Sequence, residues 1–506
     1  MERNLTIYFT SDVHGYFSPV DYATGAPAAT GLANCIQNFT QDGNTLILDG
    51  GDTLQGSPFT YFFHKHGVKR ACIPAQMMNL GGYQFITLGN HDFNYGRETL
   101  EQYLETLNAV CLCANVEGLV GVQKTALVTL ENGLRVGLTG ITTPFINTWE
   151  KPEHLKGITI HKPIPAAAQA LKELRKAGAD LTVCLYHGGF ENDLDTGARL
   201  SETEENQGWR ICHELDFDIL LTGHQHTALE NQKVANTFTC QPPDKARGYI
   251  RMDVTVDSAS GRVAAESHLY PAGAVTHPAA MTLLGSYDRE VAAWLDTPMG
   301  HLDVPLRPGL PIEMASHGSY IANFFNQVQL AASGADISAT CLGNEVRGFE
   351  QDVTIRDVVA TYIYPNTLKT LRVNRAVLRH ALERSAEYFA LDEGGRLCVS
   401  DSFLKPKVEH YNFDYFAGIQ ATIDVRRPVG QRVLSIEYKG VELPEEQALT
   451  LCMNNYRATG TGGYPCYASC EIVREQEEEI AEMIMDYVVA HQSIIIDKTP
   501  WLTVLY

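Results

Sequence analysis

The chain has 506 residues, too many for one hydrophobic core, so two or more domains are expected. Hydrophobic residues make up 44% and charged residues 20%, a globular balance that excludes a disordered chain and a membrane-embedded one. The 60 acidic residues against 39 basic ones give a formal net charge of −21, which argues against a partner held through polymeric phosphate, such as nucleic acid.

The first residues and the cysteines bear on the cellular compartment. The opening MERNLTIYFTSDVHG has no basic segment followed by an apolar core, so it does not read as a secretory leader, and no membrane span follows. The twelve cysteines include no CxxC pair, and several lie in apolar runs, so we expect reduced, buried thiols. We therefore expect a cytoplasmic protein without a membrane partner.

From residue 4 to about residue 270, short apolar runs alternate with longer amphipathic stretches. This alternation predicts an α/β domain in which helices cover a sheet. A hairpin is expected over 129–142, and a second strand pair over 249–266 closes the domain. The other predicted strands lie at 4–9, 44–49, 83–88, 180–186 and 218–223, and the predicted helices at 95–108 and 163–178.

The spacing of apolar residues predicts a helix over 278–296, which ends before Pro298 and joins two domains. We therefore expect a first domain over 1–275, a linker helix over 276–298 and a second domain over 299–506. That second domain is predicted to be α+β. Its expected helices are 314–333, 374–390 and the acidic stretch 475–492, and its expected strands are 419–425, 433–438 and 448–453.

Five apolar runs of the first domain end in clusters of Asp, Asn and His: FTSDVHG, LDGGDT, LGNHD, LYHGG and TGHQH. This mixture of carboxylates, amide and imidazoles suits two divalent cations better than one. The DxH pair and the single His187 are weak signals alone, whereas GNHD and GHQH are specific. The residues that these clusters supply are Asp12, His14, Asp52, Asn90, His91, Asp92, His187, His224 and His226.

Hydrolysis of a phosphate ester needs a nucleophile at neutral pH and groups that absorb charge on the phosphoryl oxygens. Two cations about 3.5–4 Å apart supply both, because a bridging water loses its proton easily and open coordination positions hold the phosphate. A shared carboxylate should hold the cations together. Asp52, after two glycines that permit close approach, is the expected bridge.

With these motifs in this order, the chain resembles the calcineurin-like metallophosphoesterases and, within them, the bacterial 5′-nucleotidase family. The resemblance implies a four-layer αββα sandwich in the first domain. It further implies that His91 faces the phosphate. The implied ligands are Asp12, His14, Asp52 and His226 for one metal, and Asp52, Asn90, His187 and His224 for the other.

One motif departs from the family pattern. Family members carry GNHEFD, in which the last Asp supports the catalytic His, but this chain reads GNHDFN, with Asn94 at that place and Asp92 directly after His91. We count His91 and Asp92 as catalytic. The expected role of His91 is charge stabilisation, with protonation of the leaving group in question because an Asn cannot raise an imidazole pKa as a carboxylate does.

The second domain resembles the C-terminal domain of the same family, in particular the 2′,3′-cyclic-nucleotide 2′-phosphodiesterase/3′-nucleotidase branch, in the strings TIRDVVATYIYPNTL, HYNFDYFAGIQATIDV and NNYRATGTGGYP. The resemblance places aromatic side chains around a nucleobase, each stack stabilising by roughly 1–3 kcal/mol, although core packing is the competing interpretation. The expected substrate-binding residues are Tyr411, Phe413 and Tyr464 for the base, Asn455, Arg457 and Gly463 for ribose or phosphate, and Arg347.

The sequence therefore predicts a two-metal hydrolase of nucleotide phosphoesters in which a metal-bridging hydroxide attacks phosphorus, with 2′,3′-cyclic nucleotides and 3′-nucleotides as preferred substrates. A 5′-nucleotidase or nucleotide-sugar hydrolase is the nearest alternative. A nucleotide-binding protein without activity is the alternative from another class. Manganese, zinc, iron and cobalt all suit the mixed ligand set, so the metal identity and the oligomeric state stay open.

Overall fold

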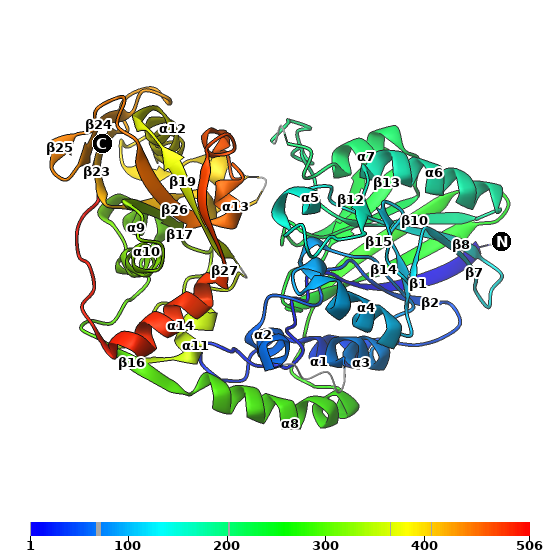
Figure 1. Cartoon of the computed structure of the whole chain (residues 1–506). Helices are drawn as coiled ribbons and strands as arrows, with labels where there is room; N and C mark the ends of the chain where they lie inside the picture. Colours follow the sequence, from blue (N-terminus) through cyan, green and yellow to red (C-terminus); the bar gives the residue numbers. More distant parts are fainter. Residues whose placement is uncertain (1, 67–71, 201–202, 365, 406) are drawn as a thin grey trace. The chain divides into compact units, whose positions relative to one another are not determined.

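The computed structural model describes residues 2–66, 72–200, 203–364, 366–405 and 407–506. The chain divides into two compact units, Met1–Ala292 and Ala293–Tyr506. Figure 1 shows the chain coloured from blue at the N-terminus to red at the C-terminus.

The first unit contains two large mixed sheets, as expected from the alternating apolar runs. The seven-stranded sheet has the order β15 (Val263–Pro271), β14 (Gly248–Asp257), β1 (Glu2–Thr10), β2 (Thr45–Asp49), β3 (Phe85–Ile86), β4 (Val110–Leu112) and β6 (Val122–Gln123). The six-stranded sheet has the order β12 (Leu229–Val234), β13 (Thr237–Gln241), β11 (Ile219–Thr222), β10 (Leu181–His187), β8 (Arg135–Thr142) and β7 (Thr125–Thr129).

The two sheets pack face to face around one apolar core, to which Ile7 of β1, Leu138 of β8 and Val183 of β10 contribute buried side chains. Helices cover the outer faces, which completes the predicted four-layer αββα sandwich (Figure 1). The helices of this unit are α1 (Leu32–Cys35), α2 (Pro58–His66), α3 (Ile73–Leu80), α4 (Gly96–Thr106), α5 (Ile146–Trp149), α6 (Pro163–Lys176) and α7 (Gly208–Glu214), and a short ladder joins β5 (Val116–Glu117) to β9 (Thr159–Ile160).

The central strands of both sheets run parallel, β1 with β2 and β3 in one and β8 with β10 and β11 in the other. All seven residues of β10 are buried, which explains why its sequence LTVCLYH is an unbroken apolar run up to its last residue. Parallel strands bring their carboxyl ends to the same edge, so the residues that follow them meet there. This edge carries the polar motifs.

Helix α8 (Pro278–Leu295) forms where the periodicity predicted a helix over 278–296, and most of it belongs to the first unit. It buries Ala280, Leu284 and Val291 on one face. The Ser18 hydroxyl donates hydrogen bonds of 2.8 Å to both carboxylate oxygens of Asp288, which ties the helix to the first unit.

The second unit is α+β, as predicted. Its five-stranded sheet has the order β22 (Asp414–Ala417), β17 (Ile337–Cys341), β26 (Leu449–Asn454), β19 (Thr367–Val373) and β27 (Ile472–Glu479), and its four-stranded sheet the order β25 (Val441–Glu442), β24 (Val433–Tyr438), β23 (Ile419–Asp424) and β29 (Leu502–Leu505). Smaller ladders join β18 (Asp352–Thr354), β16 (Pro298–Leu302) and β28 (Ser493–Ile494), and β20 (Phe389–Leu391) with β21 (Leu397–Val399).

The helices of the second unit differ from the prediction in two places. Gly318, at φ 90°, separates two helices where one was expected over 314–333. The acidic start of 475–492 belongs to edge strand β27, where Lys369 of β19 pairs with Glu475 at 2.6 Å, and the helix begins only at Ile480. The helices are α9 (Pro311–His317), α10 (Tyr320–Ser333), α11 (Ile355–Thr361), α12 (Arg375–Ala386), α13 (Asn455–Ala458) and α14 (Ile480–His491).

All twelve cysteines lie within the described ranges, and each is a free thiol. Burial raises the pKa of Cys35 to about 12, which keeps this thiol protonated at neutral pH. Within the part of the chain that the structure describes, we find no helix that is both long and apolar enough to span a membrane.

Candidate metal centre and active site

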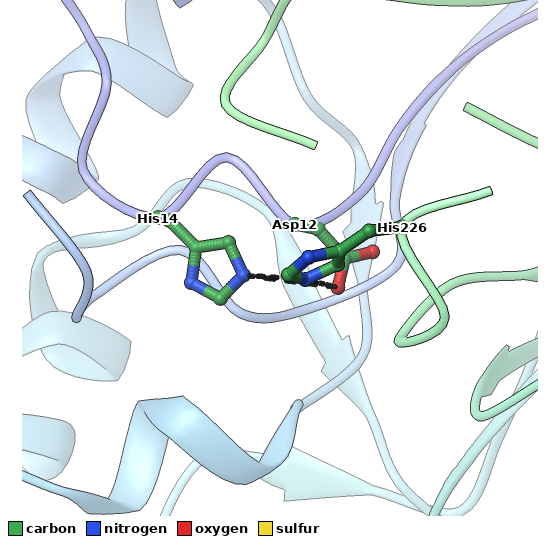
Figure 2. A group of neighbouring side chains, drawn as sticks. All are labelled: Asp12, His14 and His226. Atoms are coloured by element: carbon green, nitrogen blue, oxygen red, sulfur yellow. Dashed lines mark hydrogen bonds and ion pairs between the residues drawn. The ribbon is translucent and has the colours of Figure 1, made fainter. Parts of the chain in front are cut away.

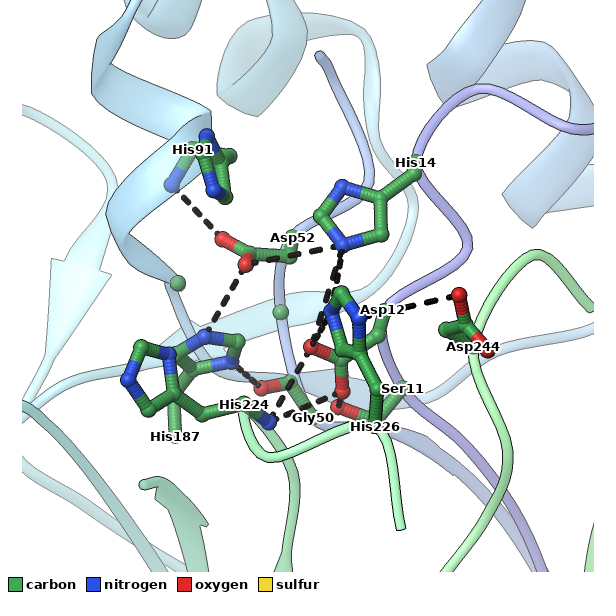
Figure 3. A network of polar contacts seen from close by, with 12 residues as sticks. Ser11, Asp12, His14, Gly50, Asp52, His91, His187, His224, His226 and Asp244 are labelled. Atoms are coloured by element: carbon green, nitrogen blue, oxygen red, sulfur yellow. Dashed lines mark hydrogen bonds and ion pairs between the residues drawn. The ribbon is translucent and has the colours of Figure 1, made fainter. Parts of the chain in front are cut away.

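The residues of the five motifs meet at the carboxyl edge of the two sheets, as the strand pattern predicted. His187 is the last residue of β10, the Asn, His and Asp of LGNHD lie in the short 3-10 helix η2 (Asn90–Phe93) after β3, and the others lie in loops that follow β1, β2 and β11. Figure 3 shows the histidines and aspartates turned toward a common centre. The ligand-type side chains form two groups, Asp12 with His14 and His226, and Asp52 with His187 and His224.

The first group brings two imidazoles against one carboxylate (Figure 2). The Nε2 atoms of His14 and His226 lie 3.0 Å apart, and His226 Nε2 lies 3.4 Å from Asp12 Oδ1. Asp12 is buried and fixed in orientation, because Ser11 Oγ donates to its Oδ2 at 2.6 Å and the His224 backbone amide donates to both oxygens at 3.0 Å. Electronegative atoms so closely spaced suit a cation between them.

Asp52 belongs to the second group and lies beside the first. Its Oδ2 lies 3.1 Å from His187 Nε2 in the second group and 3.9 Å from His14 Nε2 in the first. Its other oxygen, Oδ1, accepts a 2.7 Å hydrogen bond from the His91 backbone amide. The carboxylate therefore lies between ligand-type histidines of both groups, and the bridging role expected from the sequence stays a prediction.

Each of the four histidines has its other ring nitrogen against an oxygen acceptor outside the centre. Such a contact orients the ring, and in the neutral imidazole a hydrogen bond from this nitrogen leaves the lone pair of the other nitrogen for a metal. The acceptors are two backbone carbonyls and two carboxylates: Gln55 O for His14 Nδ1 (2.8 Å), Gly50 O for His187 Nδ1 (2.7 Å), Glu205 Oε1 for His224 Nε2 (2.8 Å) and Asp244 Oδ2 for His226 Nδ1 (3.6 Å). No sequence motif marked Glu205 or Asp244.

The electrostatics of the centre favour positive charge. Burial lowers the pKa of His14 to about 4, so its imidazole is neutral at pH 7. Burial also opposes charge on His187, but the Asp52 carboxylate outweighs burial and raises the pKa of His187 to about 10. Burial would raise the pKa of Asp52, yet the nearby His187 and His91 hold it well below its usual value.

The backbone of the centre is strained. Five residues of the centre adopt left-handed conformations, and they are five of the eleven non-glycine residues with positive φ in the described ranges. Each such residue costs roughly 1–2 kcal/mol relative to an ordinary conformation. The five are Asp12 (φ 56°), His14 (φ 50°), Asp52 (φ 59°), His224 (φ 71°) and His226 (φ 54°).

Glycines make room for the bridging loop. A Cβ on Gly51, which has φ 93°, would lie 2.4 Å from the Gly89 amide nitrogen, and a Cβ on Gly89 would lie 2.1 Å from Asp52 Oδ1. The loops after β2 and β3 therefore touch through glycine backbone. This explains the GGDT and LGNHD patterns physically.

Buried polar atoms without partners test whether metals fit this centre. Asp52 Oδ2, Asn90 Oδ1 and His187 Nε2 are buried and have no hydrogen-bond partner among the described residues. An unsatisfied buried polar atom is costly unless a ligand satisfies it, and these atoms are oxygen and nitrogen donors of the kind that divalent metals take. Two cations that share Asp52 fit this donor set.

His91 lies at the edge of the centre, with its ring centroid 5.2 Å from that of His14. Asp92 is not placed for catalysis, which corrects the expectation from the sequence. Its buried carboxylate accepts hydrogen bonds of 2.8–3.0 Å from the backbone amides of residues 52, 53, 54 and 89. Asp92 therefore anchors the loop that carries Asp52.

The aromatic residues proposed for the nucleobase have different environments. Phe413 and Tyr464 are 1% and 0% exposed and pack in the core of the second unit, so the expectation that they lie in exposed loops is wrong. The Tyr464 hydroxyl donates to the Asn412 carbonyl at 3.0 Å. Tyr411 is half-buried and remains the aromatic candidate with an accessible ring.

Arg457 and Gly463 also have structural roles that correct the sequence-based assignment. Arg457 is 1% exposed, and its guanidinium donates to Asp414 at 2.9 Å, to the Tyr411 carbonyl at 2.8 Å and to the Thr461 carbonyl at 2.6 Å. A Cβ on Gly463 would lie 2.4 Å from Arg384 Nε. The Arg384 side chain, not a ligand, therefore explains why a glycine is needed at position 463.

Arg347 is exposed, and Asn344 connects its loop to that of Tyr411. Asn344 Nδ2 donates to the Val408 carbonyl at 2.7 Å, and Asn344 Oδ1 accepts from the His410 backbone amide at 3.0 Å. Asn455 lies elsewhere in the unit, where its Oδ1 accepts from the Thr367 amide at 3.0 Å. The structure therefore links the loops of two of the candidates, Arg347 and Tyr411.

A pocket of about 150 Å³ opens beside these two loops, within the second unit. The Tyr388 hydroxyl contacts His410 Nδ1 at 2.7 Å on its wall, and burial lowers the pKa of His410, which favours the neutral ring. No sequence motif marks this wall, although His410 directly precedes Tyr411. Its lining includes Leu342, Gly343, Asn344, Tyr388, His410 and Tyr415.

The αββα sandwich, with two groups of metal-type ligands at the edge of its sheets, is the arrangement expected of a metallophosphoesterase. Comparison with known families agrees. The calcineurin-like phosphoesterase family matches residues 5–228, and the family described as the 5′-nucleotidase C-terminal domain matches residues 298–469.

Individual relatives match both units. A solved structure from Staphylococcus aureus, provisionally named a 5′-nucleotidase and crystallised with alpha-ketoglutarate, is 33% identical, with 100% of both chains covered and a TM-score of 0.91. A 2′,3′-cyclic-nucleotide 2′-phosphodiesterase/3′-nucleotidase of Haemophilus influenzae is 23% identical over 96% of this chain and 84% of its own length. The trifunctional nucleotide phosphoesterase protein YfkN of Bacillus subtilis is 24% identical over 97% of this chain, which spans 38% of that longer protein.

The chain belongs to the two-domain 5′-nucleotidase family of calcineurin-like phosphoesterases. It is a metal-dependent phosphoesterase, and the family resemblance expected from the five motifs is confirmed.

Proposed function

We propose that this enzyme hydrolyses nucleotide phosphoesters with two divalent cations, and that 2′,3′-cyclic nucleotides and 3′-nucleotides are its preferred substrates. The observation that carries the proposal is the position of Asp52 Oδ2, a buried oxygen without a hydrogen-bond partner in the described chain, next to His187 and His14 of the two ligand groups. Manganese, zinc, iron or cobalt would suit this donor set.

When bound, the two cations would lower the pKa of a shared water and take up charge on the phosphoryl oxygens. One would be held by Asp12, His14, Asp52 and His226, and the other by Asp52, Asn90, His187 and His224. The chain itself orients these ligands through Gln55, Gly50, Glu205 and Asp244.

His91 completes the proposed mechanism. Its backbone amide donates to Asp52 at 2.7 Å, and we place its ring beside the reacting phosphate. A ring at this place can stabilise charge on a phosphoryl oxygen and deliver a proton to the leaving ribose oxygen. Loss of this ring should reduce turnover without removing the metals.

We assign nucleoside recognition to the second unit. Tyr411 offers a ring for base stacking, Arg347 a cation for the nucleotide, and the adjoining pocket the polar wall of Tyr388 and His410. Tyr464, Phe413 and Arg457 support these loops from within the core.

A substrate panel tests the proposal. Purified enzyme loaded with manganese should hydrolyse 2′,3′-cyclic AMP and 3′-AMP with higher kcat/KM than 5′-AMP or UDP-glucose. Preference for 5′-AMP would favour the 5′-nucleotidase alternative, which the name of the Staphylococcus aureus relative supports. Tight nucleotide binding without hydrolysis of any substrate would indicate a binding protein and overturn the proposal.

A further inference from the structure

Asn94, which stands where the family has an aspartate next to the catalytic histidine, connects His91 to the carboxylate of Glu150. His91 Nδ1 contacts Asn94 Oδ1 at 2.7 Å, and Asn94 Nδ2 donates to Glu150 Oε2 at 2.7 Å. The sequence analysis identified the loss of the direct partner at Asn94. The structure supplies Glu150, which lies 56 residues further along the chain and belongs to no motif.

The chemistry of the side chains determines which atom donates and which accepts in each of these two hydrogen bonds. An ionised carboxylate accepts hydrogen bonds and cannot donate, so the NH₂ group of Asn94 must face Glu150. The amide oxygen of Asn94 then faces His91, and only an Nδ1–H can donate to it. Glu150 thereby selects both the orientation of the amide and the tautomer of His91, which leaves Nε2 as the atom that exchanges a proton.

Glu150 is itself held rigidly. Its side chain is 6% exposed, and its Oε1 accepts from His154 Nδ1 at 2.9 Å and from the Lys151 backbone amide at 2.8 Å. The preceding residue, Trp149, stacks on His224 with ring centroids 5.7 Å apart and an interplanar angle of 22°. The end of α5 therefore contacts a metal-type histidine and, through Asn94, the proposed catalytic one.

We propose that Glu150 is a positioning residue that holds the His91 ring through Asn94. This inference rests on the proposed function, because it gives His91 a role in turnover. Asn94 and Glu150 together replace the single carboxylate of other family members. Because Asn94 and Glu150 act together, the position of the His91 ring depends on Glu150, a residue that belongs to no motif.

The test exchanges the two functional groups. Glu150→Gln should lower kcat at least about tenfold, with KM within twofold of wild type and the metal content unchanged. Asn94→Asp alone should also lower kcat, because the new carboxylate would lie at hydrogen-bond distance from the Glu150 carboxylate and the two would repel each other. The double variant Asn94→Asp/Glu150→Gln restores a carboxylate next to His91 and an amide that can donate to it, so its kcat should return to within about threefold of wild type.

Glu153→Gln, which removes an exposed carboxylate from the same segment, is the matched control and should leave kcat unchanged. Asn94→Ala covers the case in which Glu150→Gln does not fold, and it should lower kcat to the same extent. Wild-type kcat in Glu150→Gln or Asn94→Ala, or no recovery in the double variant, would overturn the inference.

The nitrogen NMR spectrum of the zinc-loaded protein, labelled in histidine and assigned with His91→Asn, separates the two proposals. It should show the Nδ1–H tautomer of His91 in the wild type and its loss in Glu150→Gln. An unchanged tautomer in Glu150→Gln contradicts the role of Glu150. A wild type that shows the tautomer but hydrolyses no nucleotide contradicts the proposed function instead.

Discussion

Each histidine of the candidate metal centre is oriented by a contact to the ring nitrogen that faces away from the centre. Two of these contacts use backbone carbonyls, which no substitution can remove, and two use carboxylates, Glu205 and Asp244. Carboxylates behind metal-binding histidines orient the ring and increase its basicity. Metal affinity should therefore depend on residues outside the five motifs.

Glu205→Gln is expected to weaken binding of the metal that His224 holds by roughly 10- to 100-fold, because the amide no longer fixes the Nε2–H tautomer. The measurement is activity as a function of free manganese concentration. Glu204→Gln is the control, since its exposed side chain lies 3.7 Å from Lys162 and from Arg210 at the surface. Equal metal dependence in both variants would contradict the role of Glu205.

At the scale of the element, the strand ends could be predicted from the sequence, but the conformations of the loops after them could not. The runs that become β2, β10 and β11 are apolar because every residue of these strands is buried, as are the last four residues of β1, and the motifs follow these runs. The left-handed backbone of Asp52 or His224 arises from contacts between loops far apart in sequence. Residue propensity does not report such contacts.

The acidic stretch before α14 is a second case in which contacts between distant segments decide a structure that the sequence alone does not predict. Its charge and the apolar residues behind it fit one amphipathic helix, and only pairing with β19 makes residues 472–479 an edge strand. The burial of Phe413 and Tyr464 likewise follows from packing in the second unit. Aromatic residues beside glycines could not be assigned to core or surface from sequence alone.

The end of β2 predicts a pH dependence of stability. Burial raises the pKa of Asp49 to about 7, although Thr10 Oγ1 donates to it at 2.6 Å. Because the folded-state pKa lies above the unfolded value, the folded protein retains a proton that the unfolded chain loses. The retained proton stabilises the folded state by up to about 4 kcal/mol. This contribution is complete below about pH 4 and is lost as the pH rises through 7.

Asp49→Asn mimics the protonated carboxyl and should remove this dependence. Urea unfolding of the metal-free protein between pH 5 and pH 8 measures it, and the free energy of unfolding should fall more steeply with pH for the wild type than for the variant. Parallel curves for the two proteins would show that Asp49 does not titrate in this window.

At the scale of the whole molecule, the two units divide the work. The first contains the ligand groups and His91, and the second contains Tyr411, Arg347 and the pocket. In the proposed function, Tyr411 stacks on the base, away from the reacting phosphate, so this stacking should contribute equally to the ground state and the transition state.

Tyr411→Ala should therefore raise KM for 3′-AMP by roughly 5- to 100-fold, the equivalent of one lost stack, with kcat within about twofold of wild type. Steady-state kinetics on 3′-AMP and on β-glycerophosphate, which has no aromatic ring to stack, provide the measurement and its control. A loss of kcat as large as that caused by removing a metal ligand would contradict the division between the units.

The central claim is that two cations share Asp52, and metal stoichiometry tests it most directly. Elemental analysis of the reconstituted wild-type protein should find two divalent ions per chain, and activity should rise only as the second ion is bound. Asp52→Ala should bind fewer than two ions and lose turnover while remaining folded. Full activity with a single bound ion per chain, or unchanged turnover in Asp52→Ala, would contradict the account.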